Sequence, residues 1–417
     1  MEDKLRHRKA SLKIKLISKD NSPLKNQEVK ISQKTHQFLF GVGGFEAVEI
    51  ESGKKLTEKP GGVPIEEDRK SYLEEKLGKL FRFHNYATLP FYLGRYEPVE
   101  GEPEEELLKA GARWFLKRNI MLKGHPLCWH TVCAPWLMNY SNDLILKKVI
   151  ERVERDVSAF KGIINIWDVI NEVVIMPVFD KYDNAITRIC KEYGQVRIVK
   201  EVFEAAKRAN PDSCLLLNDF DVSKNYEILI DKVLQAGIPV DIIGIQSHQH
   251  QGYWGDEKVY DVLERFSRFG LPLHFTENTL ISGEIMPANI EDLNDWVVDD
   301  WPTTPEGEER QAREITRMYE ILFAHPKVEA ITTWSGGDNA WLHAPAGFLR
   351  TDNSLKPSYN SLCSKIENDW RTEITARTDA EGFVNIEGFK GGYEIICGGE
   401  TTAFKLDGKN NLLEIKQ

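Results

Sequence analysis

The stretch Ile163-Ile-Asn-Ile-Trp-Asp-Val-Ile-Asn-Glu172 decides the fold of this chain. Its first seven residues, 163–169, are mostly apolar, which is typical of a strand buried on both faces. Amphipathic stretches with helical periodicity precede it at 142–160 and follow it at 185–208. A buried strand between two helices is the repeating unit of a parallel sheet.

The same unit recurs over most of the chain. The strand candidates are 38–42, 81–86, 120–127, 163–169, 214–219, 242–247, 271–275 and 330–334. The helical stretches are 66–80, 104–117, 142–160, 185–208, 224–236, 257–268, 306–324 and 356–368. Eight strand–helix units predict a closed (β/α)8 barrel, the TIM barrel, within the α/β class. An open doubly wound sheet is the alternative, but Gly41-Val-Gly-Gly44 lacks the GxGxxG spacing of its phosphate turn.

Both ends of the chain are rich in β signals instead. Residues 11–17 and 29–31 alternate apolar and polar side chains around a turn, which predicts a β-hairpin. About four short strands are expected in the last 46 residues, 372–417. We therefore expect an N-terminal β extension at 1–36, the barrel at 37–369 and a small C-terminal β domain at 370–417. Either end is small for an independent core, so we expect the two to join at the bottom of the barrel.

Composition narrows the function. The 54 Lys and Arg against 65 Asp and Glu give a net charge of −11, which argues against a nucleic-acid partner. No apolar run reaches the roughly 18 residues of a membrane span. The six Cys have no zinc-ligand spacing, and no signal-peptide core stands at the N-terminus. We expect a cytoplasmic protein, or a secreted one whose signal peptide has been removed.

Polar and aromatic residues collect where six of the eight predicted strands end. They are His125, Trp129 and His130 after the third strand, Asn171 and Glu172 after the fourth, Asn218 and Asp219 after the fifth, Gln246, His248 and His250 after the sixth, Glu277 after the seventh, and Trp334 and Trp341 after the eighth. The carboxyl ends of the strands carry the active site in such barrels. We therefore expect these side chains to share one pocket.

Two carboxylates stand out in this set. Glu172 and Glu277 are 105 residues apart, yet the barrel brings their strand ends to opposite sides of one pocket. Glycoside hydrolysis needs two facing carboxyl groups, and Trp and His side chains suit a sugar ligand. We expect burial to raise the pKa of Glu172, and Glu277 to stay ionised beside His248.

At these residues the chain resembles glycoside hydrolase family 10, whose best-known members are endo-β-1,4-xylanases. The resemblance covers roughly 37–368 and rests on His-Pro-Leu-Cys-Trp-His at 125–130, Trp-Asp-Val-Ile-Asn-Glu at 167–172, Asn-Asp at 218–219, Gln-Ser-His at 246–248, Thr-Glu at 276–277 and Trp334. It implies a retaining mechanism with Glu172 as acid/base and Glu277 as nucleophile, their carboxyl oxygens about 5–5.5 Å apart. We expect sugar contacts from His125, Trp129, His130, Asn171, Gln246, His248, Trp334, Trp341, Arg95 and Tyr92. Trp129 is expected to pack behind His125 and His130, and it and Trp167 are the two Trp that core packing suits best.

The resemblance fails at particular positions. After strand 2, the family's Pro-Glu-Asn-x-x-Lys-Trp is replaced by Pro90-Phe-Tyr-Leu-Gly-Arg-Tyr96, so Phe91 and Tyr92 replace a carboxylate and an amide and Arg95 keeps the charge. The family's Gln after strand 3 is Val132, and Thr279 stands where His248 would find a carboxylate. These changes predict an altered substrate preference. The long segment 278–305, with Trp296 and Trp301, is expected to be a lid or wall.

Two other functions remain open from the sequence. A non-catalytic barrel could hold a glycan without cutting it. His248 and His250 could instead form the metal pair of a metal-dependent barrel hydrolase. In the favoured reading the protein needs no cofactor or metal, and its partner is an oligo- or polysaccharide.

Overall fold

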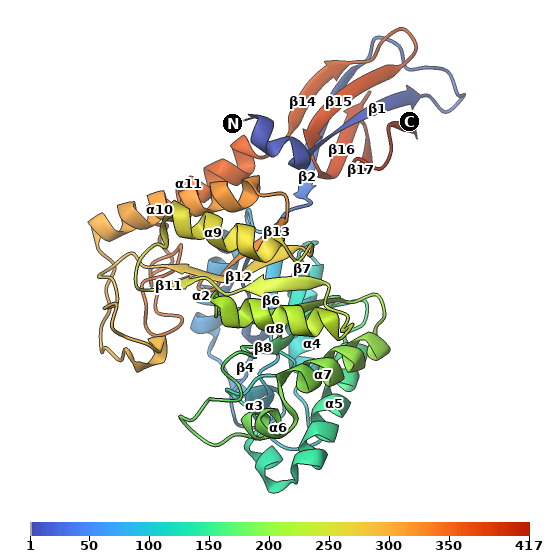
Figure 1. Ribbon diagram of the computed structural model, residues 1–417. Helices are drawn as coiled ribbons and strands as arrows, with labels where there is room; N and C mark the ends of the chain where they lie inside the picture. Colours follow the sequence, from blue (N-terminus) through green and yellow to red (C-terminus); the bar gives the residue numbers. More distant parts are fainter. Residues whose placement is uncertain (1) are drawn as a thin grey trace.

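The structure, a computed structural model, describes residues 2–417. Over this range the largest sheet is a closed barrel of eight parallel strands, so the predicted TIM barrel is confirmed (Figure 1). The strands are β3 (Leu39–Gly43), β6 (Tyr86–Pro90), β7 (Met121–His125), β8 (Ile166–Asn171), β9 (Cys214–Asp219), β10 (Ile242–Ile245), β12 (Leu273–Leu280) and β13 (Val328–Thr333). Pairing of β13 with β3 and of β10 with β12 closes the ring. The two-residue β11 (His248–Gln249) lies beside β12.

Helices surround the barrel and bury their apolar faces against it. They are α1 (Glu46–Ser52), α2 (Glu67–Leu80), α3 (Leu93–Tyr96), α4 (Glu105–Leu116), α5 (Asn142–Ala159), α6 (Ala185–Tyr193), α7 (Gln195–Ala209), α8 (Lys224–Gln235), α9 (Gly255–Ser267), α10 (Pro305–Ala324) and α11 (Pro357–Ser364), with short turns η1 (Glu2–Arg8), η2 (Pro135–Asn139), η3 (Leu293–Asp295) and η4 (Lys365–Asp369). A minor pair, β4 (Lys54–Lys55) and β5 (Val63–Pro64), lies between α1 and α2.

Two predicted elements are wrong in their bounds. The second strand runs over Tyr86–Pro90 rather than 81–86, because the chain leaves α2 only at Phe81. Asn85 then serves the neighbouring strand: its side chain accepts from the Phe40 N–H and donates to the carbonyl groups of His36 and Phe38. The predicted helix 185–208 is two helices, because Gly194 takes a positive φ of 81° between them.

The chain ends form two sheets, and each sheet contains strands from both ends. The first has the order β15–β1–β18 and the second β14–β2–β16–β17. The strands are β1 (Lys9–Ile17), β2 (Glu28–His36), β14 (Glu373–Arg377), β15 (Phe383–Phe389), β16 (Gly391–Cys397), β17 (Glu400–Leu406) and β18 (Leu412–Lys416). The predicted N-terminal hairpin is wrong, because β1 and β2 pair with C-terminal strands and not with each other. A shared apolar core of residues such as Ile14, Ile31 and Ile395 lies between the two sheets.

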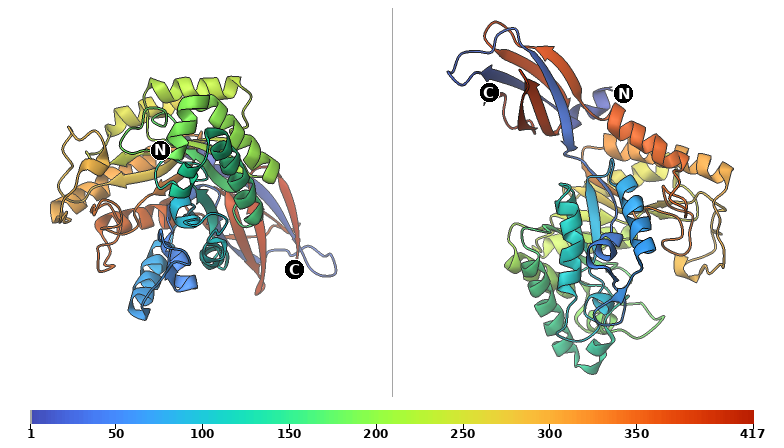
Figure 2. Two further views of the ribbon diagram at one scale, coloured as in Figure 1. Left: turned by 90° about the horizontal axis from the view of Figure 1, so that it is seen from below. Right: turned by 180° about the vertical axis from the view of Figure 1, so that it is seen from behind.

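These sheets lie at the amino-terminal ends of the barrel strands, away from the residues predicted to do chemistry (Figure 2). The link from β2 to β3 is only two residues long. Arg8 fastens the junction, because its guanidinium donates to the carbonyl groups of Phe323, His325 and Val328. Among the residues that the structure describes, no helix is long and apolar enough to cross a membrane.

Candidate active site

One hydrogen-bond network joins the two carboxyl groups singled out by the sequence. Asn171 ends β8 and donates to Glu172 Oε1 at 3.1 Å. Asn218, on the adjacent β9, donates through Nδ2 to Asn171 Oδ1 at 2.7 Å and to Glu277 Oε1 at 2.9 Å. Gln246 donates to Glu172 Oε1 at 3.2 Å. The barrel therefore brings Glu172 and Glu277 to one site, linked through two buried amides.

Trp129 belongs both to the edge of the core and to this site. Its partly buried ring packs against the core, and its indole N–H donates to Glu172 Oε2 at 2.9 Å. Trp167 is fully buried as expected, and its ring lies against Gly124 so closely that a Cβ there would come within 2.1 Å of it. The glycine next to His125 thus gives the Trp167 ring its space.

Glu172 stands in an environment that favours the neutral acid. Burial, followed by the negative charge of Glu277, raises its pKa to about 8. Its backbone has φ 59°, in the left-handed region that a non-glycine residue occupies at a cost. The Glu172 N–H donates to the Asn218 carbonyl group at 2.8 Å, which holds this conformation.

Glu277 stands in an environment that favours the carboxylate. Burial pushes its pKa up, but His125, His248 and Lys123 together outweigh burial and leave the pKa below its usual value. His248 is the direct partner, with Nε2 at 3.2 Å from Glu277 Oε2. The two carboxyl groups are therefore driven toward opposite protonation states by their surroundings.

Lys123 is a buried charge that sequence reasoning missed. Its ammonium lies 2.6 Å from Asp168 Oδ2 inside the barrel, and His125 Nδ1 lies 2.6 Å from the same oxygen. Burial opposes the charge of Asp168, but Lys123 and His125 outweigh it and lower the pKa of that carboxyl group. A lysine inside the apolar run 120–127 was the signal that could have identified this interior ion pair.

Asp219 is a second buried carboxyl group whose role the sequence left open. It accepts hydrogen bonds from the Val174 N–H at 2.9 Å and the Asp221 N–H at 3.0 Å. Burial raises its pKa to about 7. Because Val174 follows Glu172 by two residues, Asp219 holds the start of the loop that carries Glu172.

Aromatic rings lie beside the histidines that border the carboxyl groups. The Trp334 ring lies 5.2 Å from that of His125 and 6.3 Å from that of His248, and Trp341 lies 4.6 Å from His248. The Tyr92 ring lies 5.6 Å from both His125 and Trp129. Burial and the charge of Glu277 raise the Tyr92 pKa well above its usual value, so this hydroxyl group stays neutral.

The two aromatics after β6 have different places. Phe91 is fully buried, with its ring 4.8 Å from Trp167 and 5.0 Å from Phe160. The Phe91 side chain therefore fills the core and presents no surface to a sugar. Arg95 is exposed at the rim, with its guanidinium 5.9 Å from the Tyr92 ring.

His130 turns away from the carboxyl groups toward the loop after β8. Its ring lies 4.5 Å from Phe179, whose own ring lies 4.9 Å from Tyr182. Burial lowers the His130 pKa to about 4, so this ring is neutral. Phe179 and Tyr182 are aromatic residues of the rim that sequence reasoning did not single out.

His248 has a hydroxyl neighbour where the family resemblance implies a carboxylate. Thr279 Oγ1 lies 3.5 Å from His248 Nδ1 and 3.3 Å from His250 Nδ1. Burial lowers the His250 pKa to about 3. No group of three or more His, Cys, Asp or Glu side chains suited to a metal ion occurs in residues 2–417, so the His248–His250 metal hypothesis finds no further ligands.

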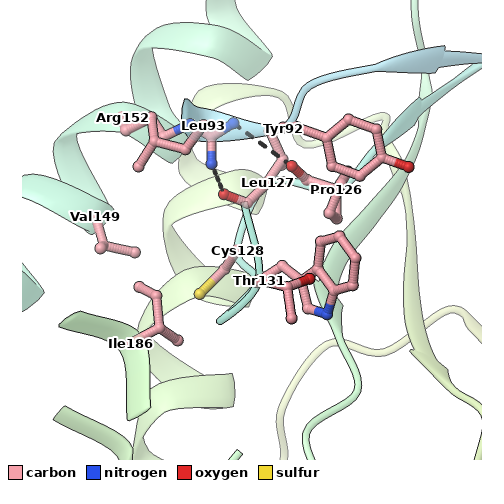
Figure 3. Close-up of a pocket in the computed structure, with 10 residues that line it drawn as sticks. Tyr92, Leu93, Pro126, Leu127, Cys128, Thr131, Val149, Arg152 and Ile186 are labelled. Atoms are coloured by element: carbon pink, nitrogen blue, oxygen red, sulfur yellow. Dashed lines mark hydrogen bonds between the residues drawn. The ribbon is translucent and has the colours of Figure 1, made fainter. Parts of the chain in front are cut away.

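A small cavity of about 10 Å³ lies behind the loop after β7, lined by Leu93, Cys128 and Arg152 among others (Figure 3). It has room for about one water molecule and not for a sugar. Arg152, from α5, donates to the carbonyl groups of Phe91, Pro126 and Leu127 beside it. This buried guanidinium fixes the segments that carry Tyr92 and Trp129.

A (β/α)8 barrel with a half-buried and a buried carboxyl group of opposite protonation preference at its strand ends has the architecture of a glycoside-cleaving enzyme. The profile of Glycosyl hydrolase family 10 matches residues 109–365 of this chain. The chain belongs to that family.

Relatives and solved structures agree with the assignment. The chain is 28% identical over 256 residues to Endo-1,4-beta-xylanase B of Thermotoga neapolitana, covering 59% of this chain and 65% of the relative. It is 26% identical over 322 residues to an endo-1,4-beta-xylanase/feruloyl esterase of Xylanibacter ruminicola, covering 70% of this chain but 42% of the relative. The alignments thus span less than two thirds of either relative. The fold matches native xylanase 10B of Thermotoga maritima with a TM-score of 0.62 at 20% identity, over 80% of this chain and 96% of that one.

Proposed function

We propose that this protein is a retaining β-glycoside hydrolase resembling the endo-1,4-β-xylanases in its site and chemistry, with Glu172 as acid/base and Glu277 as nucleophile. The observation that carries the proposal is the opposite protonation preference of half-buried Glu172 and buried Glu277, which Asn171 and Asn218 join. An acid that stays protonated at neutral pH beside an ionised nucleophile is what retaining hydrolysis requires.

In the first step the Glu277 carboxylate attacks the anomeric carbon while Glu172 donates its proton to the leaving oxygen. The glycosidic bond breaks and a glycosyl ester forms on Glu277. In the second step Glu172, now a carboxylate, takes a proton from water, and the hydroxide attacks the same carbon to release Glu277. His125, His248 and Lys123 favour the charge on Glu277 in the resting site, and Trp129 stabilises ionised Glu172 between the steps.

The substrate is a β-1,4-linked oligo- or polysaccharide related to xylan. The names of the relatives support this class, and a structural neighbour, xylanase 10B of Thermotoga petrophila, was solved in complex with xylobiose. Tyr92, Arg95 and Thr279 replace polar family residues around the site. Loss of hydrogen-bond partners for sugar hydroxyl groups changes preference strongly, so we propose a substrate preference that differs from plain linear xylan.

Kinetics of Glu277→Ala test the proposal. The variant should lose turnover of every β-glycoside by at least about 10⁴-fold, because no covalent intermediate can form. Sodium azide should restore part of the rate on an aryl glycoside and give the azide product of inverted configuration. Glu309→Ala, at an exposed position on α10, is the matched control and should retain full activity.

The substrate screen should include xylan, aryl β-xylosides, β-glucans and substituted xylo-oligosaccharides. Unimpaired hydrolysis by Glu277→Ala would remove the nucleophile assignment. Tight binding of oligosaccharides by the unaltered protein with no turnover of any substrate would favour the non-catalytic glycan-binding alternative.

A further inference from the structure

The segment between β12 and α10, residues 281–304, is a folded wall and not a loose loop. Ile281, Met286 and Trp301 form an apolar cluster with Ala344 and Ala346 from the segment after β13. The Trp301 indole N–H donates to the Glu284 carbonyl group at 2.8 Å within the same segment. In Figure 1 this segment is the yellow-to-orange connection at the left of the barrel.

This wall continues along the rim to the other carboxyl-bearing segment. Gln251, after β10, donates to the carbonyl groups of Pro287 and Ile290. Lys181, nine residues after Glu172, lies 2.6 Å from Asp292 Oδ2 and 2.7 Å from Asp295 Oδ1. The segments that follow Glu172 and Glu277 are thus joined by two ion pairs.

The segments after Glu172 and after Glu277, together with the ion pairs that join them, form a ring. The order of the barrel strands decides which strand ends lie inside this ring. Strands β9 and β10 lie between β8 and β12, so the joined segments close around their carboxyl ends. Tyr92, Trp129 and Trp334 come from β6, β7 and β13, on the other side of the carboxyl groups. Because Glu172 protonates the leaving oxygen in the proposed reaction and its segment forms one half of the ring, the ring stands on the leaving-group side.

Two exposed aromatic residues belong to the same side. Tyr182 is 49% exposed next to Lys181, and the charge of Glu172 is among the causes that raise its pKa. Phe220 directly follows β9 and is 44% exposed. Aromatic side chains supply apolar surface for one sugar or aryl ring but few hydrogen bonds for a long chain.

We propose that the ring closed by Lys181, Asp292 and Asp295 limits the leaving group to one or two sugar units or an aryl group. A long polysaccharide chain extending across β9 and β10 would have to thread the ring. Hydrolysis therefore takes place near the reducing end of short chains rather than inside long ones. This inference rests on the proposed function and specifies its substrate.

Charge reversal at Lys181 tests the inference. Lys181→Glu repels both aspartates and should open the ring. We expect kcat/KM for xylohexaose, relative to that for 4-nitrophenyl β-xylobioside, to rise at least fivefold in this variant. With xylohexaose labelled at its reducing end, the unaltered protein should release labelled mono- or disaccharide, and Lys181→Glu should also release longer labelled products.

A compensated variant and a control complete the experiment. Adding Asp292→Lys and Asp295→Lys to Lys181→Glu rebuilds the ion pairs with reversed charges and should restore the original ratio and products. Arg208→Glu, which breaks an exposed pair with Glu154 on the outer helices, should change neither. A ratio within twofold of the parent in Lys181→Glu, with unchanged products, would overturn the inference.

Failure of the inference can be separated from failure of the proposed function. If the unaltered protein hydrolyses neither substrate, the proposed function fails and the leaving-group restriction fails with it. Limited proteolysis still reports on the ring in that case, because Lys181→Glu should speed cleavage within 281–304 at least fivefold. Cleavage at the parent rate would show that the ion pairs do not join the two segments.

Discussion

At Glu172, burial and the negative charge of Glu277 favour the neutral carboxylic acid, whereas the indole N–H of Trp129 favours the carboxylate. The balance leaves the pKa at about 8, several units above that of an exposed glutamate. The hydrogen bond from the Trp129 indole thus affects how easily Glu172 regains its proton during each turnover.

Trp129→Phe removes this hydrogen bond and keeps an aromatic ring. Because the bond stabilises the charged form, its loss should raise the Glu172 pKa by about one unit. The basic limb of the kcat/KM profile should move to higher pH by the same amount, measured on an oligosaccharide. Trp136→Phe, which loses a bond to the Glu97 carbonyl group instead, should leave that limb in place. A downward shift in Trp129→Phe would contradict the assignment.

Glu172→Gln tests how much the ionisation of Glu172 lowers the free energy of unfolding. The folded-state pKa of Glu172 lies above the unfolded value, so stability is fully present below about pH 4.5 and is lost as pH rises toward 8. The glutamine variant lacks this loss. We expect equal free energies of unfolding at pH 4 and a variant about 2–4 kcal/mol more stable at pH 8, allowing for partial exposure. Denaturant titrations at both pH values measure the difference, and a less stable variant at pH 8 would refute the argument.

At the scale of elements, Arg152 couples α5 to the segments that follow β6 and β7. The guanidinium donates to the carbonyl groups of Pro126 and Leu127 (Figure 3). It also donates to the carbonyl group of Phe91, and Asp156 Oδ2 lies 3.2 Å from its Nε. The hydrogen bonds to those carbonyl groups position the backbone next to Tyr92 and Trp129. The helix therefore supports the site without touching a substrate.

Arg152→Leu should destabilise the protein by about 3–5 kcal/mol, because it leaves a buried carboxylate and carbonyl groups without their partner. Urea unfolding monitored by tryptophan fluorescence measures the change. Arg197→Leu, at an exposed position on α7, should cost less than about 0.5 kcal/mol. Equal effects of the two substitutions would show that the buried network carries no special energy.

At the scale of the whole molecule, the terminal sheets depend on both ends of the chain. β1 is the central strand of one sheet, and β2 lies between β14 and β16 in the other. Removing residues 1–36 would therefore leave β14, β15 and β18 without a partner strand and β16 paired only with β17. Residues 370–417, predicted as a small C-terminal β domain, do not form an independent unit, because they share one apolar core with the N-terminal segment.

Arg8→Ala should loosen the terminal sheets from the barrel. It removes three hydrogen bonds from a charged donor to carbonyl groups around the start of β13, worth about 3 kcal/mol together. Calorimetry should show a lower melting temperature and a separate early transition for the terminal sheets. Arg6→Ala is the neighbouring control and should melt as the parent does. A single unshifted transition in Arg8→Ala would mean that other contacts hold the junction.

The sequence by itself determined the barrel, and it singled out the two carboxyl residues that we propose as catalytic. Buried parallel strands have continuous apolar sequences, so a polar residue such as Glu172 or Glu277 is easily recognised where such a run ends. This information is local, so it can be read without knowing which strands become neighbours. The ends of the strands were less secure, as the shift of the second strand to Tyr86–Pro90 shows.

Only the tertiary structure decided how these residues work together. Phe91 and Tyr92 are adjacent in sequence, but one fills the core and the other borders the site, because a short loop turns them to different sides. The links of Asn218 to Glu277 and of Lys181 to Asp292 join residues 59 and 111 positions apart. The pairing of β1 with β15 is longer still. Such contacts depend on closure of the barrel and on packing between distant segments, which local periodicity does not encode.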